Sequence, residues 1–80
     1  MTIIEYIFTA HARDRMRERN ISAEEVRLVL SNPDMIYPGT KGETNNMRMV
    51  KGRNIRVIFV GKEPKKIITV IVVGQPGEAK

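Results

Sequence analysis

The chain has 80 residues, with 14 Lys and Arg against 9 Asp and Glu, a single His and no Cys. This length suits one small domain, and the missing cysteines exclude disulfides and thiolate metal sites. Zinc usually takes several nitrogen or sulfur ligands, so we expect neither a metal nor another cofactor. The longest apolar run, at 67–73, is too short to cross a bilayer. We therefore expect a cytoplasmic protein without membrane contact.

The first predicted elements are a strand and a helix. Residues 2–8 are β-branched and aromatic with rough alternation, which is typical of a strand. Thr9 is a good N-cap and predicts a helix that begins at Ala10. Ala12 and Met16 are the clear buried contacts of this helix. Such a thin apolar stripe places the helix on the surface.

A second predicted helix has stronger start and stop signals. Ser22 and Glu25 have the spacing of a capping box, and Ile21 before them completes a hydrophobic staple. Pro33 ends the helix near Asn32. The inward face is formed by Val26, Val29 and Leu30. Because so few residues separate the helices, they must meet in a tight αα corner.

The second half of the chain predicts a meander. Residues 35–46 are rich in Gly, Pro, Thr and Asn, which indicates a loop with at most a short extended start. Strands are predicted at 47–51, 55–60 and 66–73, with a three-residue turn at 52–54 between the first two. The last strand is apolar on both faces and is expected in a central position, flanked by 55–60 and the N-terminal strand.

These elements predict an α+β fold of order β-α-α-β-β-β. Two helices should pack on one face of a four-stranded, mostly antiparallel sheet, within a single domain at 1–74 followed by a disordered tail at 75–80. The three-residue turn puts Met47 and Met49 on one face with Ile55, and Arg48 with Arg56 on the opposite face.

Positive charge is concentrated in the second half. Residues 41–66 hold eight Lys and Arg against two Glu, a net charge of +6. A polarised basic surface suits a polyanion, most simply a nucleic acid, although it can also serve only solubility.

One segment resembles a known family. "HARDRMRERNISAEEVRLVLSNP", residues 11–33, is similar to a small bacterial and archaeal domain family of unassigned function. That family is placed in the RelE/ParE-like toxin superfamily, near BrnT-type toxins. The resemblance implies a RelE-like fold over residues 3–73, and an activity of toxin type. RelE-like members cleave mRNA, whereas ParE-like relatives attack gyrase.

The candidate catalytic residues lie on the first helix. His11, Arg15 and Arg19 are spaced four apart and form one ridge on a helix. A neutral imidazole beside a bound phosphate can take the proton of a ribose 2′-OH, while guanidinium groups stabilise the charge that develops on phosphorus. The competing interpretation is a solvated helix face, with His11 capping the helix or bonding to a neighbouring loop.

The candidate phosphate-binding residues lie on the predicted sheet and its hairpin: Arg48, Lys51, Arg53 and Arg56. Two functions follow from these sites. The first is RNA interaction by a metal-independent endoribonuclease of toxin type. The alternative is a non-catalytic module that binds RNA or an acidic, antitoxin-like protein through the same basic surface.

Overall fold

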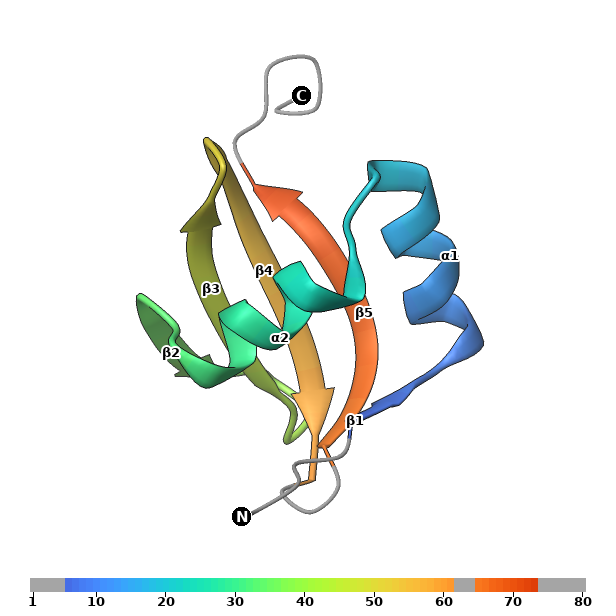
Figure 1. Cartoon of the computed structure of the whole chain (residues 1–80). Coiled ribbons are helices and arrows are strands. Elements are labelled where there is room, and N and C mark those ends of the chain that lie inside the picture. Colours follow the sequence, from blue (N-terminus) through green and yellow to red (C-terminus); the bar gives the residue numbers. More distant parts are fainter. Residues whose placement is uncertain (1–5, 62–64, 74–80) are drawn as a thin grey trace, which may run out of the picture.

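The computed structural model describes residues 6–61 and 65–73. The elements follow in the order β1 (Tyr6–Phe8), α1 (Ala10–Arg19), α2 (Ala23–Ser31), β2 (Met35–Pro38), β3 (Thr44–Val50), β4 (Arg53–Val60) and β5 (Lys65–Val73). The strands form one five-stranded sheet in the order β1-β5-β4-β3-β2. Helix α2 lies across the sheet and α1 lies beside β5, so the domain is α+β (Figure 1).

The predicted sheet of four mostly antiparallel strands is wrong, because the sheet has five strands and is mixed. The additional strand, β2, lies at the start of segment 35–46, where the sequence allowed a short extended stretch but no strand of the sheet, and it pairs antiparallel with β3. It has only four residues and ends at Pro38, which is tolerated because β2 is an edge strand. Strand β1 pairs with β5 in parallel, whereas the other neighbouring strands pair antiparallel, so the sheet is mixed.

Both predicted helix starts are confirmed. The Thr9 side chain accepts a hydrogen bond from the Ala12 N–H, and Ser22 and Glu25 form the reciprocal capping box. Helix α2 ends at Ser31 with Asn32 as its C-cap, as the following proline predicts. Asn20 ends α1 with a positive φ of 57°, which turns the chain directly into α2.

The predicted turn between β3 and β4 is wrong by one residue. Val50 pairs with Arg53, so the turn consists of Lys51 and Gly52 alone. Both residues have positive φ, 51° and 80°, as a type I′ hairpin turn requires. This register pairs Arg48 with Ile55, so Arg48 and Arg56 lie on opposite faces of the sheet.

A single core lies between the helices and one face of the sheet. Strand β4 contributes Ile55, Val57 and Phe59 in strict alternation, and α2 contributes Val26, Val29 and Leu30. Strand β5 lies between β1 and β4, so its predicted central position is confirmed. The predicted tail at 75–80 and most of the strand predicted at 2–8 lie outside the described residues.

Candidate functional site

The predicted ridge lies on α1, at the edge of the fold. Ala12 is the buried residue of this helix, and Met16 is partly buried against the core. His11 is exposed, whereas Arg15 and Arg19 are each half-buried. At the start of this helix the N–H groups of Ala12 and Arg13 bond back to Thr9, and within residues 6–61 and 65–73 those of Ala10 and His11 have no partner. The ridge therefore presents an imidazole ring and guanidinium groups along one flank.

Among the residues that the structure describes, two ion pairs form between side chains of α1 itself. Arg15 Nη1 is 2.6 Å from Glu18 Oε1, and Arg17 Nη1 is 3.4 Å from Asp14 Oδ1. The Arg15 and Glu18 side chains are 37% and 56% exposed. Exposed pairs of this kind contribute only about 0–1 kcal/mol. A phosphate group can therefore replace Glu18 as the partner of Arg15 at little energetic cost.

The four sheet-side candidates do not form one surface. Arg48 donates a 2.8 Å hydrogen bond to the Asn32 carbonyl and lies 3.5 Å from Asp34, so it stabilises the end of α2. Arg56 lies on the other face of the sheet and donates to the Tyr37 hydroxyl at 3.0 Å. Lys51 is exposed at the tip of the hairpin.

Arg53 connects the start of β4 to the αα corner. Its Nη1 donates to the Arg19 carbonyl at 2.7 Å, and its Nη2 donates to the Asn20 carbonyl at 3.1 Å. Nη2 also contacts both carboxylate oxygens of Glu25, at 3.2 and 3.3 Å. The Arg53 and Glu25 side chains are only 23% and 11% exposed, respectively. Arg53 thus joins the end of α1, the start of α2 and the sheet.

Glu25 is ionised more readily than an ordinary glutamate. The Ser22 N–H donates to its carboxylate at 2.9 Å and lowers the pKa of Glu25 below 4.5; burial opposes this shift, and the positive charge of Arg53 supports it. The sequence identified Glu25 only as a capping residue. Its partner Arg53 lies 28 positions away, so no local pattern indicated the pair.

We expect Glu25→Gln to remove a pH-dependent part of the stability. A carboxylate whose folded pKa is lowered stabilises the fold above its unfolded pKa, and this contribution is lost as pH falls through the folded value. The parent should therefore exceed the variant in unfolding free energy at pH 7, and the gap should shrink below pH 4.5. Urea melts between pH 3 and 7 measure this gap.

Glu24→Gln, on the exposed side of the same helical turn, is the matched control and should stay within about 0.5 kcal/mol of the parent at pH 7. A gap between parent and Glu25→Gln that stays constant down to pH 3 would contradict the role given to the carboxylate charge.

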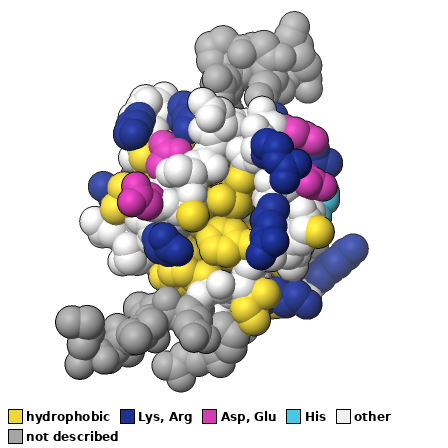
Figure 2. Space-filling model, turned by 45° about the vertical axis from the view of Figure 1, so that its right-hand side comes forward, with side chains coloured by type: hydrophobic (Ala, Val, Ile, Leu, Met, Phe, Trp, Pro, Cys, Tyr) yellow, Lys and Arg dark blue, Asp and Glu magenta, His cyan; other side chains and the backbone are white. Residues whose placement is uncertain are grey.

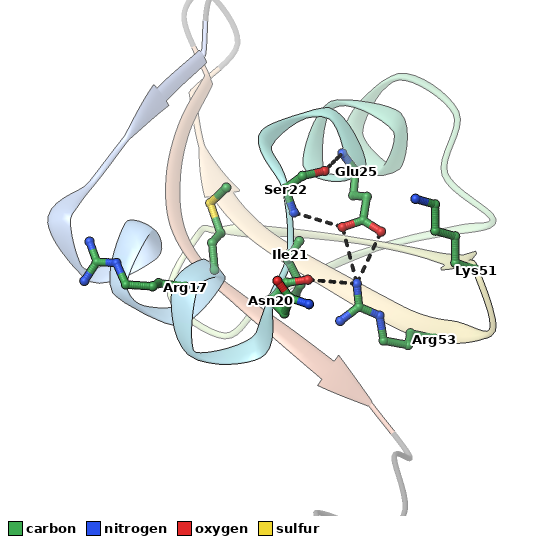
Figure 3. A pocket seen from close by; sticks show the side chains of 8 residues that line it. Arg17, Asn20, Ile21, Ser22, Glu25, Lys51 and Arg53 are labelled. Carbon is green, nitrogen blue, oxygen red and sulfur yellow. Dashed lines mark hydrogen bonds and ion pairs between the residues drawn. The ribbon is translucent and has the colours of Figure 1, made fainter.

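A hollow of about 470 Å³ lies at the αα corner, and we call it the corner hollow. It is lined by residues 20–22 of the corner, by Met16, Arg17 and Glu25 from the helices, and by Lys51 and Arg53 from the hairpin. Figure 3 shows Lys51 and Arg53 on one side of the corner, while the Arg17 side chain extends away from them on the other side. The sequence had singled out Lys51 and Arg53, but nothing in it indicated their proximity to Asn20.

Figure 2 shows hydrophobic side chains reaching the surface in the middle of one face, with Lys and Arg side chains around them and Asp and Glu beside several of these.

Within residues 6–61 and 65–73, no group of three His, Cys, Asp or Glu side chains is placed to hold a metal ion. The helices of this part are also too short and too polar to span a membrane.

The fold and surface define a small α+β domain with a basic helix beside one edge of a mixed sheet. The model of a family described as "Domain of unknown function (DUF4258)" matches residues 8–72, and the chain belongs to this family. No curated protein and no solved structure matches the chain.

Proposed function

We propose that this domain binds RNA through α1 and acts as a metal-independent endoribonuclease of toxin type. The supporting observation is the composition of α1, which buries Ala12 and presents His11, Arg15 and Arg19 along one flank. The resemblance of residues 11–33 to RelE/ParE-like toxins points to the same activity. Superfamily likeness alone does not establish activity, so the proposal rests on the side chains of the ridge.

The ridge carries the groups that cleavage of a phosphodiester needs. His11 takes the proton of the ribose 2′-OH, and the 2′ oxygen then attacks the adjacent phosphorus. Arg15 and Arg19 stabilise the additional negative charge on the phosphoryl oxygens. The bond from phosphorus to the 5′ oxygen breaks and this oxygen takes a proton from water. His11 passes its proton to the hydroxide that is left, and a 2′,3′-cyclic phosphate remains.

The sheet-side residues take a smaller part in this proposal than the sequence suggested. Arg48 and Arg53 hold the helix ends, and their guanidinium groups contact backbone carbonyls and carboxylates. Lys51 and Arg56 remain as candidate phosphate contacts, on different parts of the surface.

We expect Arg15→Ala to weaken binding of a single-stranded RNA oligomer and to flatten its salt dependence. Loss of one phosphate contact should reduce the slope of log K against log salt by about 0.7. Fluorescence anisotropy at several salt concentrations measures the slope, and electrophoresis with EDTA present detects cleavage.

Arg27→Ala is the control, because Arg27 is an exposed cation of α2 and should leave the slope unchanged. Equal slopes for the parent and Arg15→Ala would place RNA away from the ridge. If the chain binds RNA but does not cleave it, its function is RNA binding alone.

A second candidate function is binding of an acidic, antitoxin-like protein without catalysis. The observation that favours it is the sheet face that neither helix covers. There Met35 and Met49 are 53% and 54% exposed, and Met35, Met47 and Arg56 lie in one row across β2, β3 and β4. A partner with acidic and apolar side chains would complement this row. Failure to bind or cleave RNA, together with binding of an acidic peptide that Arg56→Ala weakens, would favour this function.

A further inference from the structure

The corner hollow combines two unusual backbone positions. Asn20 and Lys51 are the non-glycine residues with positive φ in the described part of the chain, at 57° and 51°. They lie 31 positions apart in the sequence, yet both line the same hollow. Non-glycine residues in the left-handed region are uncommon and gather at functional sites.

Turn geometry accounts for Asn20 but not for Lys51. Asparagine tolerates the left-handed conformation and is a frequent helix C-cap. The first central position of a type I′ turn favours Asn, Asp or Gly, whereas Lys carries a steric penalty there. Lys51 is exposed, so core packing does not account for its presence either. Its ammonium group is the feature that Asn or Gly at this position would lack.

The walls of the hollow offer complementary chemistry. Lys51 adds positive charge at one side, next to the guanidinium of Arg53. The Asn20 side-chain amide makes no hydrogen bond within residues 6–61 and 65–73, so it can both donate and accept. Met16 supplies an apolar surface. The negative charge of Glu25 is already held by Arg53 and the Ser22 N–H.

We propose that the corner hollow binds one nucleotide of an RNA strand, with its phosphate at Lys51 and its base edge at Asn20. This inference rests on the RNA binding proposed above and names the second contact of the strand. The volume of about 470 Å³ lies within the range of small-molecule sites, roughly 300–1,000 Å³. The amide of Asn20 matches the donor and acceptor pair of a base edge, and Met16 packs against the flat side of the base.

The hollow and the ridge lie on different flanks of α1. Met16 and Asn20 line the hollow, whereas the Arg17 side chain extends away from it. The ridge is rotated by about 120° around the helix axis from Met16 and Asn20, at 100° per residue. An RNA strand that contacts both the ridge and the hollow must cross α1. The hollow would then hold a nucleotide next to the nucleotide that lies at the ridge. It contributes affinity and does not take part in the cleavage step.

Lys51→Asn tests the phosphate contact without disturbing the turn, because Asn is favoured at this turn position. We expect the salt slope of RNA binding to fall by about 0.7. Lys41→Asn is the matched control, since Lys41 is an exposed cation near the opposite end of β3. Identical slopes for the two variants would overturn the phosphate contact.

Asn20→Gly tests the base contact, because glycine keeps the positive φ of the helix cap and removes only the amide group. We expect RNA affinity to fall by about fivefold or more, with an unchanged melting curve. Parental affinity for this variant would overturn the base contact. If the parent itself binds no RNA, the proposed function fails; if the parent binds and both variants bind equally well, only this inference fails.

NMR titration with the four nucleoside monophosphates tests whether the ligand of the hollow is a nucleotide and whether that nucleotide belongs to an RNA strand. We expect at least one to shift the Asn20 side-chain amide, inorganic phosphate to leave that amide unshifted, and the RNA oligomer to displace the nucleotide. Failure of RNA to compete would overturn the assignment to a strand. An oligoglutamate peptide that shifts the Asn20 amide as strongly would overturn the nucleotide assignment.

Discussion

Arg53→Ala should lower the unfolding free energy by about 3 kcal/mol, because it leaves the mostly buried carboxylate of Glu25 without its charged partner. The Arg19 and Asn20 carbonyls lose their hydrogen bonds in the same variant. In a domain of this size, each kcal/mol shifts the melting temperature by about 4–8 °C. Calorimetry and urea melts at pH 7 measure both quantities.

Two companion variants separate charge from geometry. Arg53→Lys keeps the positive charge but lacks the planar fork that reaches two carbonyls and a carboxylate, so we expect an intermediate loss. Arg48→Ala removes an arginine that holds one carbonyl and the more exposed Asp34, and should cost about 1 kcal/mol. An Arg53→Ala loss no larger than that of Arg48→Ala would contradict the central role of Arg53.

His11→Ala should reduce RNA cleavage by at least about 100-fold, the usual contribution of a positioned acid or base. RNA affinity should stay near the parental value, since in this proposal the arginines of the ridge, and not His11, hold the phosphate. Arg19→Ala should instead lower affinity and rate together, because a phosphate ligand acts before and during the reaction. Single-turnover cleavage with EDTA, alongside anisotropy, measures rate and affinity separately.

Stability provides the control for His11→Ala. His11 is exposed, so the substitution should change the unfolding free energy by no more than about 0.5 kcal/mol. A large drop in melting temperature would identify His11 as a structural residue and remove it from the proposed mechanism. Unchanged cleavage would leave the ridge as a solvated helix face.

Local sequence signals predicted the helices well because helix ends depend on neighbouring residues. The Thr9 cap, the Ser22 and Glu25 capping box and the stop before Pro33 all act within a few positions along the chain. The apolar character of 66–73 on both faces likewise predicted the central position of β5.

The sheet was predicted less well than the helices, because strand pairing depends on residues that are far apart in the sequence. Strand β2 is short and ends in proline, so its sequence resembles a loop until β3 lies beside it. The turn at Lys51 and Gly52 was missed because a three-residue turn sorts the apolar side chains and the two arginines onto separate faces, whereas the observed pairing of Val50 with Arg53 does not. That single shift of register moved Arg48 to the face opposite Arg56 and divided the predicted basic surface.

The sequence by itself determined where the two helices begin and end, and that α1 carries His11 and Arg15 on one flank, because helical periodicity requires only local information. Only the tertiary structure decided which arginines remain available to a ligand. Arg53 reaches carbonyls 34 and 33 positions away and a carboxylate 28 positions away. Such contacts depend on the path of the whole chain, because they form only when the hairpin reaches the αα corner.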